Sequence, residues 1–306
     1  MIYGLENWSS YYTDRQALAL TTLVRLVANA GEQLLRVAEA PFAIAVQTCL
    51  ALTMSREADK LSSIARWDAT RENPQGTFAR QALPMLWDFN EVNPLSGAGG
   101  DWDTALDWVC RVCESQVQSP TGRVEKASAA DHPLPSDSAD LFVTDPPYYD
   151  AVPYAYLSDY FYVWLRRALA SALPDLFNSS LVPKDEEIVV DRMHELSNST
   201  HDIAFYESEL TKAFMEGRRV IRPDGIGTIV FASKTTASWE AILKAVVDAG
   251  WMITASWPID TELENRVSAQ GQARLGSERI AGYISGAISV YSDRASVGCI
   301  IAAQVR

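Results

Sequence analysis

The sequence predicts an α/β protein in which a helical N-terminal section, residues 1–118, precedes an α/β section, residues 119–306. Helical periodicity dominates the first third of the chain, which has almost no strand pattern. Further along, short apolar runs alternate with helical patterns, as is typical of a parallel α/β sheet. The length of 306 residues suits one large domain or two small ones.

In Asp14–Ala38, leucines recur at steps near three and four, which predicts a helix. We expect further helices at Pro41–Ser63 and Asp101–Gln118. Between them, the polar segment Trp67–Gly76 is predicted to be a loop, and Thr77–Phe89 a short helix and turn.

In the C-terminal section, we expect strands at Gly122–Ser128, Ala139–Thr144, Gly227–Ala232 and Trp251–Trp257. Helices are predicted at Tyr156–Leu173, Ile203–Ile221 and Trp239–Ala249, with a turn at Arg222–Gly225. The polar segment Pro174–Asp202 is predicted to be an irregular insertion.

The chain is acidic, with a net charge of −13 and a pI of about 4.7. Phosphate binding depends on clustered Lys and Arg, so this balance counts against the chain gripping nucleic acid by itself. A polynucleotide substrate would require a local basic patch, or basic surface on another segment or partner. Solubility is the simplest role for the charge.

The four cysteines favour a reduced, cytoplasmic protein without a metal. No signal peptide pattern precedes them. Cys110 and Cys113 form a lone C-x-x-C in a predicted helix, whereas a structural zinc site needs four ligands. We therefore expect buried helix cysteines. The longest apolar run, Phe42–Met54, is too short to span a bilayer and suits a core helix.

The sequence Asp145-Pro146-Pro147-Tyr148, here called the DPPY loop, directly follows the predicted strand Ala139–Thr144. Open α/β sheets place their sites at the carboxyl ends of strands. The residue types suit methylation of an exocyclic amine, whose nitrogen lone pair is conjugated with a purine ring. Two hydrogen-bond acceptors on its N–H groups draw that lone pair out of conjugation, and an aromatic side chain holds a base that has left the duplex.

In this interpretation Asp145 accepts one N–H of the amine and the Pro146 carbonyl accepts the other. Pro146 and Pro147 stiffen the loop, because proline fixes φ and lacks an N–H donor. Tyr148 stacks on the base. The competing interpretation is a proline-rich turn after a strand, with Asp145 as a helix cap.

The stretch from Asp145 to Arg167, DPPYYDAVPYAYLSDYFYVWLRR, resembles a family of adenine-specific DNA methylases whose longer members carry a zinc ribbon. Other segments resemble the family in the same order, and the resemblance covers roughly residues 1–277. These segments are Thr13–Leu23, Ser62–Asp68, Thr77–Trp102, Ala232–Leu243, Trp251–Glu262 and, more weakly, Asn265–Ser277.

The resemblance implies a Rossmann-like methyltransferase fold that uses S-adenosylmethionine to methylate adenine in DNA. It makes Asp145, Pro146, Pro147 and Tyr148 the catalytic residues. Three further side chains are expected to contact the substrate, namely Tyr149, Asp150 and Tyr154. Asp131 matches the position of a polar contact to the cofactor, although a plain turn residue is the alternative.

The sequence departs from the family in its glycines and its tail. The family carries a glycine-rich cofactor loop after its first strand, but Gly97-Ala98-Gly99-Gly100 has no apolar strand before it. We therefore expect Met1 to lie inside a longer architecture, either a truncated product or one half of a split enzyme whose upstream subunit carries the glycine loop. Residues 278–306 do not resemble the family, as after a frameshift.

Two alternatives stay open at this point. The same chemistry serves amino methylation of RNA. The chain is otherwise a non-catalytic remnant or scaffold subunit, in keeping with the missing glycine loop.

Overall fold

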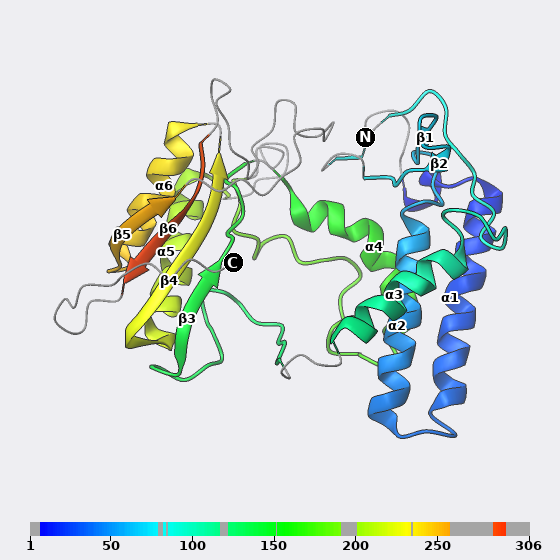
Figure 1. Cartoon of the computed structure of the whole chain (residues 1–306), viewed down its shortest axis with the longest axis horizontal. Coiled ribbons are helices and arrows are strands. Elements are labelled where there is room, and N and C mark those ends of the chain that lie inside the picture. The colour runs from blue at the N-terminus through cyan, green and yellow to red at the C-terminus, as the bar shows by residue number, and fades with distance from the viewer. Residues whose placement is uncertain are drawn as a thin grey trace. The chain divides into compact units, whose positions relative to one another are not determined.

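The computed structural model describes residues 7–78, 82–83, 85–116, 122–150, 152–190, 201–233, 235–257 and 284–291. The chain forms two compact units, each with its own core (Figure 1). Unit 1 combines Met1–Val124 with Tyr154–Lys184, and unit 2 combines Glu125–Pro153 with Asp185–Arg306. The predicted helical section thus ends six residues before the first unit boundary, and the helical unit also takes in Tyr154–Lys184.

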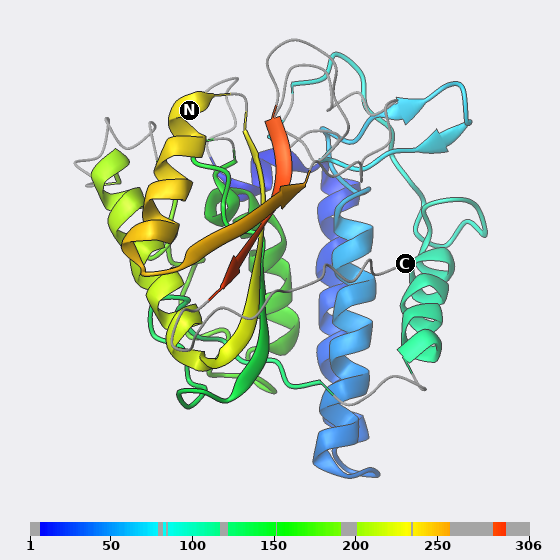
Figure 2. The same cartoon turned by 60° about the vertical axis from the view of Figure 1, so that its left-hand side comes forward.

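Unit 1 is built from helices. A short 3-10 helix η1 (Trp8–Tyr11) precedes α1 (Asp14–Leu34), α2 (Ala40–Ala58), α3 (Trp102–Gln116) and α4 (Tyr154–Leu169). Helices α1 and α2 lie side by side in both views (Figures 1 and 2). The predicted helices at these positions are confirmed, with ends shifted by a few residues.

Local sequence explains where these helices begin. The Thr13 side chain accepts a hydrogen bond from the Gln16 backbone N–H at 3.3 Å, and the Gln16 side chain accepts from the Thr13 N–H at 3.0 Å. This reciprocal capping box satisfies two amides that lack helical partners. Pro41 stands in the first turn of α2, where its missing N–H costs nothing.

Two predictions for the connection between α2 and α3 are wrong. Trp67–Asp68 (β1) and Asn73–Pro74 (β2) pair as an antiparallel hairpin, visible in Figure 2, within the predicted loop. The described residues of Thr77–Phe89 form no helix. The reason lies at Thr77, whose N–H and hydroxyl both donate to the Asp59 carbonyl, at 2.6 and 2.8 Å, and tie the chain to the end of α2.

The core of unit 1 lies between α1, α2 and α4. Tyr160 of α4 is fully buried at its centre, and its hydroxyl donates to the Ala58 carbonyl at 2.7 Å. Around it pack aliphatic side chains of α1 and α2, among them Leu20, Val24 and Met54. The buried positions of α4 accordingly recur at helical spacing, as at Tyr160, Val163, Trp164 and Ala168.

Unit 2 contains a four-stranded mixed sheet in the order β3-β4-β6-β5. Its strands are β3 (Ala139–Thr144), β4 (Ile221–Ser233), β5 (Met252–Trp257) and β6 (Ile284–Tyr291). Strands β3 and β4 are parallel, and β6 is antiparallel to both β4 and β5. A mixed helix and strand unit with a parallel pair agrees with the predicted α/β class.

Arg222–Gly225, predicted as a turn, lies inside β4. The turn residues appear there as an irregularity in the ladder. Ala139 pairs with Ile221 and Leu141 with Ile226, so the register advances two residues on β3 and five on β4. Gly225 suits this bulge, because a Cβ there would lie 2.9 Å from the Asp140 carbonyl oxygen.

The strand content also differs at two other places. Residues 122–127 form no strand, and their side chains are exposed, so no apolar burial stabilises one. Conversely, β6 lies in residues 278–306, where the sequence predicts no strand. That segment supplies an interior strand of the sheet.

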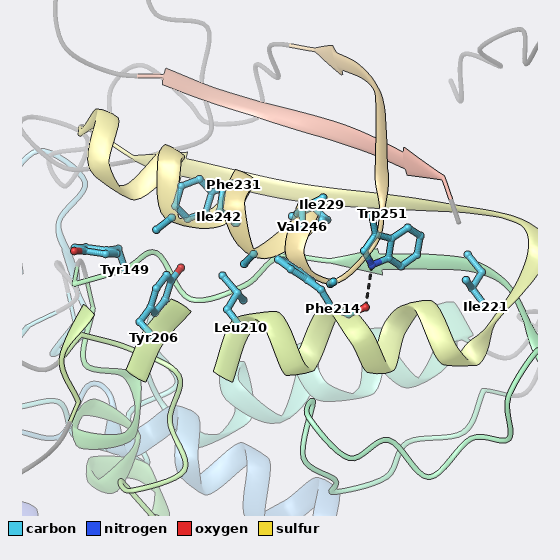
Figure 3. Close-up of a cluster of buried hydrophobic side chains, with 13 residues drawn as sticks. Tyr149, Tyr206, Leu210, Phe214, Ile221, Ile229, Phe231, Ile242, Val246 and Trp251 are labelled. Atoms are coloured by element: carbon cyan, nitrogen blue, oxygen red, sulfur yellow. Dashed lines mark hydrogen bonds between the residues drawn. The ribbon is translucent and has the colours of Figure 1, made fainter. Parts of the chain in front are cut away.

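Helices α5 (Ile203–Val220) and α6 (Thr236–Asp248) lie on one face of this sheet (Figures 1 and 2). Figure 3 shows the core between them, where Phe214, Phe231, Ile242 and Trp251 meet. The Trp251 indole N–H donates to the Phe214 carbonyl at 2.9 Å, which satisfies the one polar atom of this buried ring.

Candidate active site

The DPPY loop begins where β3 ends, beside the last part of β4. Thr144 pairs with Ile229, and β4 then continues to Ser233. Because the two strands are parallel, their carboxyl ends share one edge of the sheet. The N-terminus of α6 lies at the same edge, where Thr235 caps the helix and its N–H donates to the Ser233 hydroxyl at 3.2 Å.

The second half of the loop is held by hydrogen bonds. The Pro147 carbonyl accepts from the Tyr149 N–H and from the Tyr206 hydroxyl, both at 2.9 Å. Burial raises the pKa of Tyr206, so its hydroxyl keeps the proton that it donates. The Tyr149 carbonyl in turn accepts from the Val190 N–H at 3.0 Å. These bonds fix the chain where Tyr149 adopts a positive φ of 56°.

The Pro146 carbonyl differs from that of Pro147. It accepts no hydrogen bond from any residue that the structure describes. Pro146 is buried, and the hydrogen bonds of the Pro147 and Tyr149 carbonyls hold the segment that follows it. The Pro147 carbonyl is therefore used in holding the loop, whereas the neighbouring Pro146 carbonyl has no partner among the described residues.

Asp145 precedes this carbonyl by one residue and is exposed at the surface. Displacement of its hydration by surrounding protein raises the pKa of the carboxyl, while a hydrogen bond from the Tyr148 side chain lowers it, and the net shift is upward. A carboxylate has about four acceptor positions, so the bond from Tyr148 leaves capacity for another donor.

Tyr148 is half-buried and begins a row of aromatic rings. Its ring lies edge-to-face with Phe231 at 5.5 Å between centroids, and Phe231 lies edge-to-face with Trp239 at 5.1 Å. Sequence reasoning missed Phe231 and Trp239 as neighbours of the loop. The available signal was their position, at the end of β4 and in the first turn of α6, because parallel strands bring such residues to one edge.

The other predicted site residues lie in varied places. Tyr149 is 7% exposed and packs edge-to-face on Tyr206 at 5.2 Å (Figure 3). Asp150 is exposed beside the loop. Tyr154 is the first residue of α4 and belongs to unit 1. The structure thus brings the Tyr149 ring into the core of unit 2.

Asp131 lies away from the DPPY loop, at the opposite end of β3. Its N–H donates to the Ser128 carbonyl at 3.2 Å in a turn. The next residue, His132, donates its N–H to Glu216 at 3.0 Å, near the C-terminus of α5. That helix end leads into the start of β4, so Asp131 sits at the amino edge of the strands.

The cysteines of unit 1 do not match the prediction of buried side chains. Cys110 and Cys113 stand on α3 as expected, but both are exposed. The Cys113 sulfur lies 3.9 Å from that of Cys49 on α2. Among the described residues, no group of three or more His, Cys, Asp or Glu side chains is arranged to hold a metal ion. Cys299 lies outside the described residues.

No protein-family model matches the chain, and no curated protein is significantly similar to it. Within the part of the chain that the structure describes, no helix is both long enough and apolar enough to cross a bilayer.

Proposed function

We propose that the DPPY loop is the catalytic loop of an S-adenosylmethionine-dependent methyltransferase that acts on the exocyclic amine of adenine in DNA. The observation that carries the proposal is the pair of acceptors at Asp145 and Pro146. One is a carboxylate, the other a carbonyl without a described partner, and the chain beside them is fixed at Pro147.

These acceptors suit an amino group. Asp145 accepts one N–H of the amine and Pro146 accepts the other, which draws the nitrogen lone pair away from the ring. Tyr148 offers an aromatic ring, braced by Phe231, for a base taken out of the duplex. The rigid backbone supports catalysis because acceptors held in place need no rearrangement during the reaction.

The sheet also supports the proposal. Its last strand in sequence, β6, lies between β4 and β5 and runs antiparallel to both. We propose that this mixed sheet is part of a Rossmann-like methyltransferase sheet, with the DPPY loop at the carboxyl end of β3. The fold proposal follows the resemblance of residues 1–277 to adenine-specific DNA methylases.

At the edge of the sheet that carries the DPPY loop, the described residues include no glycine-rich loop for S-adenosylmethionine. Neither the loop after β3 nor that after β4 is glycine-rich, and Asp131 stands at the opposite edge of the sheet. We therefore propose that the glycine loop comes from an upstream subunit, which also supplies basic surface for DNA, given the net charge of −13. The steps derived above concern only the base.

The missing glycine loop favours a second candidate, a non-catalytic remnant or scaffold. Calorimetry with S-adenosylmethionine separates the two when the proposed upstream subunit is added. A methyltransferase half binds the cofactor more tightly in the mixture than alone. A remnant gains no affinity from the added subunit.

The test of the proposed activity is transfer of a radiolabelled methyl group from S-adenosylmethionine to a panel of DNA, RNA and protein. Asp145→Asn keeps the size of the side chain and removes its charge, and should lower labelling of DNA by at least about a hundredfold. Asp248→Asn, an exposed position at the end of α6, is the matched control and should label as the wild type does. Label on RNA or protein in place of DNA contradicts the substrate assignment.

A further inference from the structure

Unit 1 contains a cavity of about 170 Å³ at the N-terminus of α3, far along the chain from the DPPY loop. It lies between α2, the β1–β2 hairpin and the loop before α3. Gly100 has a positive φ of 89°, and a Cβ there would lie 2.6 Å from the Pro74 ring. The glycine therefore lets this loop close over Pro74 at the cavity wall.

Glu57 of α2 forms part of the wall, and its side chain is fully buried. Neither carboxyl oxygen has a hydrogen-bond partner among the described residues. A buried carboxyl without partners is costly, so a donor is expected to meet it. The nearby Asp101 is different, because it caps α3 by accepting from the Thr104 N–H at 3.0 Å.

Two cations stand on the same wall. The Lys60 ammonium donates to the Pro74 carbonyl at 2.8 Å and keeps two further N–H donors. The Arg56 guanidinium lies 5.4 Å from the Trp108 ring and makes no ion pair within the described residues. The N-terminal end of α3 adds partial positive charge. A ligand that pairs with all three side chains therefore needs a cationic donor for Glu57 and an anionic group for Arg56 and Lys60.

We infer that this cavity binds an α-amino-carboxylate group, with the ammonium on Glu57 and the carboxylate on Arg56 and Lys60. A simple cation would meet repulsion from Arg56, Lys60 and the helix end. A simple anion would leave Glu57 without a partner. A metal ion would find only one uncommitted carboxyl. A cavity of about 170 Å³ holds more than a single water molecule and suits a small polar group such as the end of an amino acid.

This chemistry has two sources, a free amino acid or the amino-acid end of a larger molecule such as S-adenosylmethionine. The inference stands whether or not the DPPY loop is a methyltransferase site. Calorimetry on the whole chain uses the twenty amino acids and S-adenosylmethionine as probes. Binding of a free amino acid assigns the first source, and binding of S-adenosylmethionine alone assigns the second.

Two sets of experiments test the charged side chains of the cavity wall. One uses variants of the protein, and the other uses ligands that carry only the ammonium or only the carboxylate. Glu57→Gln and Arg56→Gln should each weaken binding by about tenfold or more, because each removes one charged contact. Glu32→Gln and Arg36→Gln, exposed positions on and just after α1, are matched controls that should bind as the wild type does. The corresponding amine without a carboxylate, and acid without an ammonium, should bind far more weakly.

Proton release gives a readout that a merely structural Glu57 would not produce. Burial and the neighbouring Asp101 raise the pKa of Glu57 to about 8, against the opposing effects of Lys60 and Arg56. At pH 7 Glu57 is mainly protonated, so an arriving ammonium expels a proton. The heat of binding should then depend on the ionisation enthalpy of the buffer in the wild type and not in Glu57→Gln. Absence of binding by every probe, or binding unchanged in both variants, overturns the inference.

Discussion

The buried hydroxyl of Tyr206 holds the DPPY loop by donating to the Pro147 carbonyl. Removal of this one hydroxyl tests that role. Tyr206→Phe removes the bond to the Pro147 carbonyl and leaves the ring in place against Tyr149. We expect a loss of about 1 kcal/mol in the free energy of unfolding, because the carbonyl keeps only the Tyr149 N–H. Urea denaturation measures the loss. Unchanged stability would show that the hydroxyl does not hold the loop.

Glu57 predicts a pH dependence of stability. Its pKa is about 8 in the folded chain against an ordinary value of 4.5, so between these values the folded state holds a proton that the unfolded state releases. The free energy of unfolding therefore falls as the pH rises through this window, by up to about 1.4 kcal/mol per pH unit.

Glu57→Gln removes this contribution, so its stability relative to the wild type should rise between pH 5 and pH 8. Denaturant unfolding at the two pH values measures the difference. Glu32→Gln, on the exposed face of α1, should leave the slope as it is. An equal slope in Glu57→Gln and wild type would contradict the raised pKa.

At the scale of residues, the sequence predicts a catalytic role for the DPPY loop because the residues of the proposed chemistry occupy consecutive positions. Phe231 and Trp239 join the loop through sheet pairing and helix packing, which a linear pattern does not contain. The same holds for Glu57, which looks like an ordinary helical glutamate until the loop at Gly100 closes over it. The sequence assigned the second acceptor to Pro146, but it did not show that the Pro147 carbonyl is occupied, because its partner Tyr206 lies 59 residues further along.

At the scale of elements, helix α1 tests whether its N-terminal capping residues stabilise the helix. Thr13→Ala removes the side-chain half of the capping box and an exposed hydrogen bond to Glu91, and should destabilise the chain by about 1 kcal/mol. Thr21→Ala, an exposed position within the same helix, is the matched control and should be close to neutral. Thermal unfolding compares the two. Equal effects would mean that the cap does not stabilise α1.

Helices were predicted better than strands, for physical reasons. A long apolar pattern at helical spacing, such as that of α1 or α5, predicts a helix from local sequence alone. Strand β4 includes Arg222–Gly225 because neighbouring strands stabilise a bulge that looks like a turn in isolation. Strand β6 lies between β4 and β5 and pairs with both, and this long-range pairing is not visible in a linear pattern.

On the scale of the whole molecule, each unit has a separate core, and this predicts separate responses to core mutation. Phe231→Ala should cost about 3–5 kcal/mol, because it leaves a cavity beside Ile242 and Tyr148. Hydrogen exchange should show lost protection in β4 and α6, with α1 and α2 little changed. Equal loss in both units would show that the two cores unfold as one.

The central claim is that Asp145 holds an adenine amine during methyl transfer. Its most direct measurement is labelling of DNA by radiolabelled S-adenosylmethionine with wild type and Asp145→Asn, each mixed with the proposed upstream subunit. The labelled nucleoside is then identified. The account predicts N6-methyladenine from the wild type and at least about a hundredfold less from Asp145→Asn. Equal labelling by both, label on another base, or no label from either would contradict it.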